Sequence, residues 1–288
     1  MSILYIIGNG LDLHHGLRTA PQDFRNILKT KRIYNEWSNA YDILDSYCVN
    51  WSEYEESLSD LDLDEIECQN LIMPDYLSDH EYDRDGGITN IQMYLESLND
   101  AIQSSLKDMV KIANIDTERR ALLGECYPLF NLEDRVLSFN YTSTLENMFD
   151  FARHIPICHI HGFYDTGESL IFGYNQSKGN YGNKLNSTFE DGDYYVDQQR
   201  ELIYNFYQSW QKSIQIKCLN DFLSCCAGID EVVVYGHAMG KVDAVYMEQI
   251  ERVLNPRRWR ISYHTDSDSV LFNAQQYPFK SKFNFFRW

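Results

Sequence analysis

The sequence predicts an α/β fold: a Rossmann-like, mostly parallel central sheet flanked by helices, with a helical insertion. Short continuous apolar runs recur along the chain, which is typical of strands buried on both faces of a parallel sheet. Helical patterns lie between these runs, as expected where strands and helices alternate. Glycine-containing turns directly follow two of the runs and mark the ends of strands.

The first predicted strand, Ile3–Ile7, is followed at once by the turn Gly8-Asn9-Gly10. Similar apolar runs predict five further strands, at Val136–Phe139, Ile155–Ile160, Leu170–Phe172, Val232–Tyr235 and Arg260–Tyr263. Ligands of parallel α/β sheets bind at the carboxyl ends of the strands. Polar residues that directly follow these runs are therefore the candidate site residues.

Helix-start and helix-stop signals lie between the strands. Two capping boxes predict helix starts, because a hydroxyl residue and the Glu or Gln three positions later satisfy each other's backbone amides. A proline after an apolar periodic stretch predicts a helix end, because its ring cannot continue the helix. The predicted helices are 19–37, opened by Thr19, Pro21 and Gln22; one opened by Ser143 and Glu146; and Asp243–Leu254, ended by Asn255-Pro256.

Two stretches depart from the alternation. Residues 38–130 carry helical periodicity and almost no strand signal, which predicts a helical insertion within a single α/β domain spanning 1–288. Within it, Glu53–Glu67 holds eight acidic residues and no basic one, the pattern of a solvated helix face or of a surface for a basic partner. Residues 174–197, rich in Gly, Asn, Asp and Tyr, predict a flexible loop or lid.

Composition excludes several classes of protein. A net charge of −18 repels phosphate backbones, so broad nucleic-acid binding is not expected. Apolar residues make up 44% of the chain, which excludes global disorder. No apolar run approaches the roughly 20 residues of a membrane span. The start of the chain lacks a signal-peptide pattern, and seven scattered cysteines indicate a reducing compartment. We therefore expect a cytoplasmic protein that does not contact a membrane.

The Gly8-Asn9-Gly10 turn is the first candidate for binding chemistry. Glycines after a strand let backbone amides approach a phosphate closely. The third glycine of the dinucleotide fingerprint is replaced by Leu13, and the acidic residue expected about 20 positions later is missing, which excludes an ordinary hydride-transfer domain. The turn alone fits a nucleotide site or a simple chain reversal, and Asp12 fits a ligand contact or a helix cap.

Further polar residues follow later strands. Asn140 stands where a strand meets a capped helix, and its amide can hold a water or a ribose hydroxyl or close a turn. His159 and His161 lie on one face if the strand extends that far. They can then form a metal pair, provide one general base supported by its neighbour, or be structural histidines. The segment Gly236–Gly240 resembles a nucleophile elbow, but Ala238 stands at the nucleophile position, which excludes that hydrolase chemistry. No C-x-x-C motif or third ligand at a motif-like spacing is present, so no metal site is predicted.

In their order along the chain these motifs resemble one family. They are Gly8-Asn9-Gly10-Leu11-Asp12, Gly16-Leu17, Thr19, Asp23-Phe24, Ser138-Phe139-Asn140-Tyr141-Thr142, Leu145-Glu146, His159-Ile160-His161-Gly162 and Tyr235-Gly236-His237 with Asp243. Together they closely resemble the bacteriophage abortive-infection AbiH family, over a span from near the start to about residue 250. The resemblance implies a role in phage defence and an unknown phage-derived trigger.

The same motif order is similar to the sirtuin-type NAD-binding fold, which implies a sirtuin-like core. The glycine-rich loop of sirtuins corresponds to Gly8–Asp12, and their Gln-Asn-x-Asp element corresponds to Phe139–Thr142. Their catalytic His-Gly corresponds to His161-Gly162, and a later Gly-Thr-Ser turn corresponds to Gly236–Ala238. Asp12 replaces a serine near the phosphates, and Thr142 replaces an aspartate near the nicotinamide. The zinc-binding cysteine pairs of deacetylating sirtuins are missing, which argues against protein deacetylation.

This resemblance implies hydrolysis of NAD, as the substrate, at its nicotinamide–ribose bond. Asn140 would hold the ribose or a water, and His161 would relay a proton, as the two catalytic residues. The implied nucleotide-binding residues are Gly8, Asn9, Gly10, Asp12, Tyr141, Thr142, His159, Gly236 and His237. The expected partner is a small-molecule nucleotide, and the chain is also expected to form a homo-oligomer.

Three alternatives stay open at this point. The first is a non-catalytic nucleotide-binding sensor with the same fold. The second is a metal-dependent nuclease or other hydrolase of the defence type, which would use Asp12, His159 and His161. The third is an interaction protein that acts through the acidic helical insertion.

Overall fold

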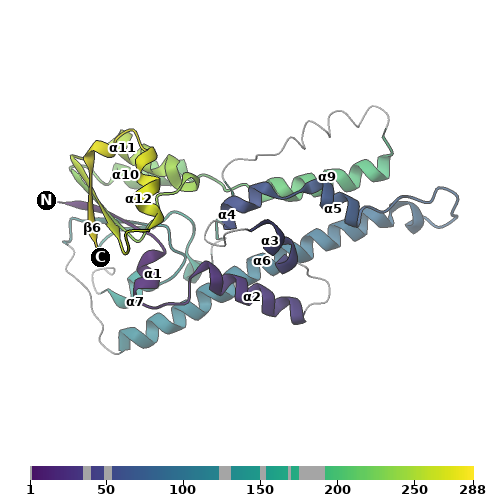
Figure 1. The fold of residues 1–288 in the computed structure, drawn as a ribbon, viewed down its shortest axis with the longest axis horizontal. Coiled ribbons are helices and arrows are strands. Elements are labelled where there is room, and N and C mark those ends of the chain that lie inside the picture. The colour runs from purple at the N-terminus through teal and green to yellow at the C-terminus, as the bar shows by residue number, and fades with distance from the viewer. Residues whose placement is uncertain are drawn as a thin grey trace. The chain divides into compact units, whose positions relative to one another are not determined.

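The structure is a computed structural model that describes residues 2–34, 40–48, 54–122, 131–149, 154–167, 170–174 and 192–288. Its contacts divide the chain into two compact units, each built from separate stretches of sequence (Figure 1). Unit 1 consists of Met1–Ala20, Lys107–Ile171 and Ser213–Trp288, and unit 2 of Pro21–Leu106 and Phe172–Lys212.

Unit 1 contains a six-stranded parallel sheet. Its strands are β1 (Ile3–Ile7), β2 (Arg135–Ser138), β3 (Ile157–His159), β4 (Glu231–Tyr235), β5 (Arg258–Tyr263) and β6 (Phe283–Arg287). They lie in the order β3-β2-β1-β4-β5-β6, and every neighbouring pair is parallel. This is the strand order of doubly wound dinucleotide-binding folds, in which the direction of strand addition reverses between β1 and β4. The predicted α/β, Rossmann-like fold class is confirmed.

The sheet is buried on both faces because its central strands carry apolar side chains on both sides. In β1, Leu4 and Ile6 belong to one hydrophobic cluster and Ile7 to another, as the twofold alternation of a strand requires. The first cluster includes residues of α10 (Ile216–Ser224) and α11 (Ala244–Leu254). The second includes residues of α1 (Gly10–His14) and α7 (Thr144–Met148). A short helix, α12 (Ser269–Asn273), adds Val270 to the first cluster.

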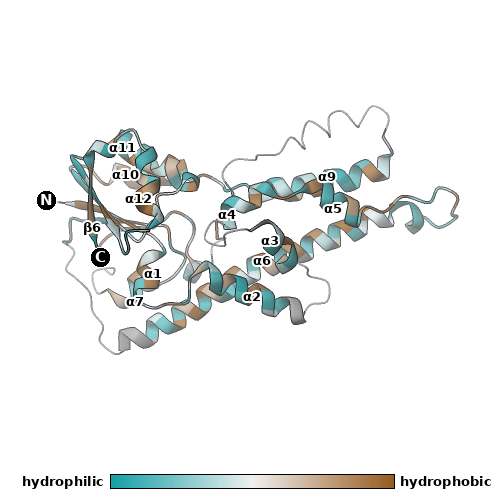
Figure 2. Ribbon diagram, in the orientation of Figure 1, coloured by the Kyte–Doolittle hydropathy of each residue, from teal (hydrophilic) through white to brown (hydrophobic). Residues whose placement is uncertain are grey.

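Unit 2 is helical in its described residues. It contains α2 (Pro21–Tyr34), α3 (Ala40–Tyr47), α4 (Tyr54–Ser57), α5 (Leu63–Asn70), α9 (Tyr194–Ser209) and the first part of α6 (Tyr82–Leu122). The buried apolar residues of α6 in this unit recur at helical spacing: Ile91, Leu95, Leu98, Ile102 and Leu106. Figure 2 shows the resulting alternation of brown and teal along α6. Among the described helices, none combines the length and the apolar composition that crossing a membrane requires.

Local differences from the predicted elements have physical causes. The strand predicted at Leu170–Phe172 is wrong: these residues form no ladder, and their apolar character reflects burial of Leu170 and Phe172 outside the sheet. The strand β6 was not predicted, because phenylalanines stand on both of its faces, Phe283 and Phe285 on one and Phe286 on the other, and hide the strand alternation. The helix predicted over 19–37 begins at Pro21 and extends to Tyr34. Residues 35–39 lie outside the described residues.

The predicted insertion and lid are described only in part. Between residues 40 and 122 the described chain is helical or irregular, which leaves the assignment of 38–130 as an insertion a prediction. Residues 175–191 of the predicted loop or lid lie outside the described residues. Its last residues, Tyr194–Asp197, form the first turn of α9, because Asp193 caps that helix by accepting from the amides of Tyr195 and Val196 at 3.0 and 3.3 Å.

Candidate active site at the carboxyl edge of the sheet

The turns that follow β1 and β4 are in direct backbone contact. The Gly8 amide donates to the Tyr235 carbonyl at 2.9 Å, and the Gly10 amide donates to the Gly236 carbonyl at 2.7 Å. A Cβ atom on Gly10 would lie 2.5 Å from the Gly236 Cα, and one on Gly8 would lie 2.6 Å from the His237 Cα. Gly236 itself has φ of +63°, which favours glycine. These glycines let the two turns meet at the point where the strand order reverses.

The contact between the two turns engages the backbone amides that the first turn was expected to offer to a ligand. The amides of Gly8 and Gly10, which were expected to clamp a pyrophosphate, already donate to backbone oxygens of the chain. The side chain of Asn9 is also engaged, because its Nδ2 donates to the Thr19 carbonyl at 2.8 Å. The packing of the two turns therefore accounts for the glycines without a ligand. Nucleotide contacts of Gly8, Asn9, Gly10 and Gly236 stay predictions.

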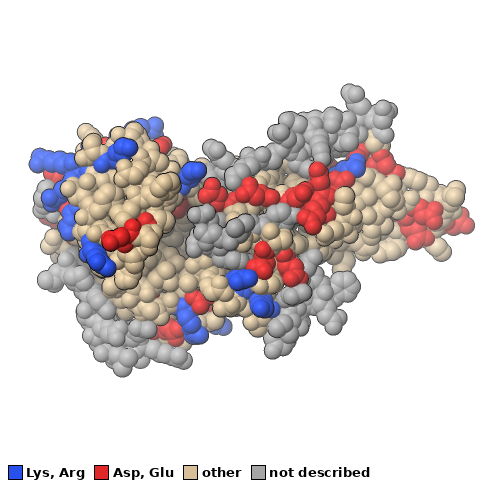
Figure 3. Space-filling view, in the orientation of Figure 1, with Lys and Arg blue, Asp and Glu red and all other residues tan. Residues whose placement is uncertain are grey.

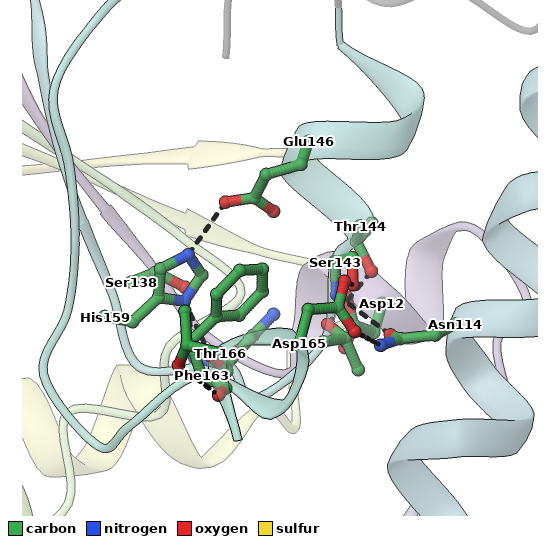
Figure 4. A network of polar contacts seen from close by, with 12 residues as sticks. Asp12, Asn114, Ser138, Ser143, Thr144, Glu146, His159, Phe163, Asp165 and Thr166 are labelled. Carbon is green, nitrogen blue, oxygen red and sulfur yellow. Dashed lines mark hydrogen bonds and ion pairs between the residues drawn. The ribbon is translucent and has the colours of Figure 1, made fainter. Parts of the chain in front are cut away.

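Asp12 is a buried carboxylate beside these turns, on α1 (Figure 4). Its side chain is 1% exposed, and its Oδ2 accepts from the Thr142 hydroxyl at 2.8 Å. The Thr144 hydroxyl in turn donates to Thr142 at 3.0 Å. The other carboxylate oxygen, Oδ1, has no hydrogen-bond partner among the described residues. Burial raises the pKa of Asp12 to about 6, against the opposing effect of the Thr144 and Thr142 hydroxyls and of the Asn140 side chain.

Asn140 lies at the end of β2, the neighbour of β1 in the sheet. Its Nδ2 donates to the Gly8 carbonyl at 3.2 Å, which ties the ends of the two strands together. Its side-chain oxygen is buried and has no partner among the described residues. Asp12 Oδ1 and Asn140 Oδ1 are therefore two buried acceptors without a hydrogen-bond donor among the described residues. Such atoms are rare in folded proteins and each carries a desolvation penalty of about 1–3 kcal/mol, which a ligand or water donor can relieve.

A second group joins two histidines through one carboxylate. His161 Nε2 lies 3.4 Å from Asp243 Oδ1, and His237 Nε2 lies 3.3 Å from Asp243 Oδ2. The Met239 amide donates to His237 Nδ1 at 2.9 Å, so the neutral imidazole carries its proton on Nε2, facing Asp243. The Phe139 ring contacts both imidazoles, with centroids 5.0 Å from His161 and 4.3 Å from His237. The carboxylate thus links the chain segments that follow β3 and β4.

His159 makes a third contact, with Glu146 (Figure 4). Its Nε2 lies 2.8 Å from Glu146 Oε1, and its Nδ1 lies 3.1 Å from the Asn140 carbonyl oxygen. Both partners are acceptors when Glu146 is ionised, so both hydrogen bonds form only with a proton on each ring nitrogen. The ring stacks on Phe163 at 4.2 Å. These contacts hold the Asn140 backbone, which makes His159 a positioning residue for Asn140.

Several residues of this network lack a sequence signal. Asn114 of α6 accepts from the Ser143 amide at 2.9 Å and donates to Asp165 at 3.0 Å, and the Ser143 hydroxyl also donates to Asp165. Ser143 was predicted to cap α7, but its side chain makes no capping bond. The predicted capping partner Glu146 binds His159 instead. Asn114 lies 29 and 51 positions from its two partners, so no local pattern reveals it.

The structure therefore gathers the predicted site residues in small groups. Asp12, Asn140 and Thr142 lie together at the ends of β1 and β2, with Gly8. His161 and His237 share Asp243. Tyr141, which was also predicted, belongs to neither group, and its hydroxyl donates to the Ile171 carbonyl at 2.7 Å.

Comparison with known proteins identifies the family. The family model described as bacteriophage abortive infection AbiH matches residues 4–263. The chain belongs to the AbiH family. The match includes β1 to β5 and the residues of the candidate site, whereas β6 lies beyond it. AbiH membership implies a role in abortive infection, a defence against bacteriophage. A search of curated proteins found no significant match.

The glycine contact predicts the outcome of a matched pair of substitutions. Gly10→Ala should destabilise the protein by about 2 kcal/mol or more, because the new methyl group meets the Gly236 backbone, which cannot move aside. Gly240→Ala is the control, because the nearest atom to its Cβ would be 3.8 Å away. Urea unfolding followed by circular dichroism measures both. Equal midpoints for the two variants would contradict the proposed close packing of the turns.

The buried charge of Asp12 predicts a pH-dependent stability. The folded state binds the Asp12 proton more tightly than the unfolded state, so this group favours folding below about pH 4 and loses that contribution as pH rises through about 6. The change corresponds to about 3 kcal/mol. Asp12→Asn should therefore raise the melting temperature at pH 8 but not at pH 4, measured by calorimetry. Asp266→Asn, at an exposed site of unit 1, should change neither value.

Proposed function

We propose that this AbiH protein binds a nucleotide at the carboxyl ends of β1 and β2 and hydrolyses NAD at the nicotinamide–ribose bond during phage defence. The observation that supports this most is the buried pair Asp12 and Asn140, each with an unsatisfied oxygen. The pair lies beside the reversal point of a 3-2-1-4-5-6 parallel sheet, where doubly wound folds bind dinucleotides.

The chemistry of NAD cleavage suits a buried carboxylate. Breaking the bond leaves the electron pair on nicotinamide, which departs neutral, and builds positive charge on the ribose. Since the pKa of Asp12 is about 6, the carboxylate is mostly ionised at pH 7 and can stabilise that charge in a site shielded from water. A water oxygen then bonds to the ribose carbon and loses a proton. The Asn140 side-chain oxygen can accept from that water or from a ribose hydroxyl.

In this proposal, the histidine pair accepts the proton that the attacking water loses. His161 would take it from the attacking water through a ribose hydroxyl, as a general base. Asp243, 3.4 Å from His161, would stabilise the resulting imidazolium. His237, whose Nε2 lies 3.3 Å from the other oxygen of the same carboxylate, would help to hold it in place. Asp243 and His237 are thus positioning residues for His161 in this proposal.

The remaining predicted binding residues act through others in this proposal. Thr142 fixes the Asp12 carboxylate, and His159 holds the Asn140 backbone. Tyr141 fixes the segment at Ile171, whose amide also donates to the His161 carbonyl at 2.8 Å. These contacts support a preorganised site, in which binding does not have to order the side chains that receive the ligand.

A nucleotide sensor is the second candidate. The Gly8 and Gly10 amides donate within the fold, so fewer backbone amides are left to hold the pyrophosphate of NAD in place for cleavage. The metal-dependent alternative has less support. Its three suggested ligands contact different partners: Asp12 contacts Thr142, His159 contacts Glu146, and His161 contacts Asp243. NAD binding without nicotinamide release would favour the sensor.

Nicotinamide release tests the proposal directly. Purified protein incubated with NAD, and cells expressing it during phage infection, should both lose NAD. Asn140→Ala and His161→Ala should each abolish the loss while leaving the circular dichroism spectrum unchanged, because both remove groups from the reacting centre. His154→Ala, at an exposed site of unit 1 that precedes β3, should retain it. Unchanged NAD consumption in both site variants, or no NAD loss by wild-type protein in either setting, would refute hydrolysis.

Asp243→Asn distinguishes positioning from a merely structural role. An amide at this position cannot stabilise an imidazolium as a carboxylate does, so kcat should fall by roughly 10²–10⁴ while KM for NAD changes little. The acidic limb of the pH–rate profile should also shift, because the proton acceptor His161 loses its anionic neighbour. An unchanged pH profile would show that Asp243 does not act through His161.

A further inference from the structure

The connection between α5 and α6 in unit 2 exposes an unusual number of large apolar side chains. Within residues 71–82, hereafter the α5–α6 tip, Met73 is 68% exposed, Leu77 is 96% exposed and Tyr82 is 62% exposed. Ile72 and Tyr76 are also exposed. Single exposed apolar residues need no explanation, but five in so short a segment form the kind of patch that marks an interaction site.

The α5–α6 tip is held in a defined conformation by polar contacts within unit 2. The Ile72 amide donates to Gln199 Oε1 at 3.0 Å, and Gln199 Nε2 donates to the Ile72 carbonyl at 2.9 Å. Gln199 is buried and packs on Gly87, where a Cβ atom would lie 2.7 Å from its Nε2. The Tyr76 hydroxyl donates to Asp193 at 2.6 Å. The apolar side chains are thus displayed on an ordered support, which lowers the entropic cost of binding.

Carboxylates alternate with the apolar side chains along this segment. Residues 75–85 contain Asp75, Asp79, Glu81, Asp83 and Asp85 against a single arginine, Arg84. Figure 3 shows red Asp and Glu atoms gathered at this end of unit 2. Unit 2 as a whole has 24 Asp and Glu against 9 Lys and Arg, whereas unit 1 has 19 against 16. Most of the net charge therefore belongs to the unit that carries the tip.

We propose that the α5–α6 tip is a docking surface for a basic polypeptide segment that inserts an apolar side chain beside Leu77 and Met73. The acidic surroundings would attract lysine and arginine side chains and orient the approach, while the apolar centre would provide most of the affinity. A second copy of this chain is a poor occupant, because its own tip carries the same negative charge. An anionic membrane surface is repelled for the same reason.

A random dodecapeptide library selected on the full-length wild-type protein tests this surface. Selected peptides should be enriched in Lys and Arg and contain Leu, Phe or Trp. The affinity of the best peptide, measured by fluorescence anisotropy, should fall about tenfold or more in the double variant Met73→Ser, Leu77→Ser, which changes no charge. It should also weaken as salt rises, because the attraction is screened.

Phe272→Ser is the matched control, because Phe272 is 83% exposed on unit 1 and its loss should change the affinity less than twofold. Equal binding to the wild type and the double variant would overturn the proposal, as would a selection that yields no basic peptides. Sedimentation of the wild type and of the double variant measures whether the chain forms a dimer through the α5–α6 tip. A dimer that dissociates in the double variant would show that the occupant is a second copy of the chain rather than a basic partner.

Discussion

The backbone contact between the turns after β1 and β4 is the constraint on which the site depends. Gly10 and Gly236 approach so closely that neither tolerates a side chain, and the hydrogen bonds of Gly8 and Gly10 extend the pairing of β1 and β4 beyond the strands. This contact fixes where α1 begins, and therefore where Asp12 enters the interior. Asn140 then joins the end of β2 to the same turn through the Gly8 carbonyl.

The ionised carboxylate of Asp12 opposes folding rather than stabilising the structure. Its raised pKa means that the ionised carboxylate is less favourable in the folded protein than in water. An asparagine could accept the same hydrogen bond from Thr142 without that penalty. Proteins retain such unfavourable buried charges chiefly at sites where the charge performs chemistry or binding. The carboxylate of Asp243 differs, because each of its oxygens lies within 3.4 Å of an imidazole nitrogen.

The two units differ in net charge and in the functional and exposed side chains that they carry. Unit 1 is almost balanced in charge and carries the sheet, the buried acceptors and the histidine pair. Unit 2 carries most of the negative charge and the exposed apolar side chains of the α5–α6 tip. The candidate site and the α5–α6 tip therefore lie in different units of the chain.

The sequence by itself determined the fold class, five of the six strands, the glycine turns and the family. These features follow from local patterns, because apolar runs, capping residues and glycine spacing act over a few residues. The tertiary structure alone decided which side chains meet. Glu146 binds His159 rather than capping α7, His161 and His237 share Asp243, and Asn114 reaches Ser143. Such contacts join residues far apart in the chain, and they depend on strand order, which no local pattern encodes.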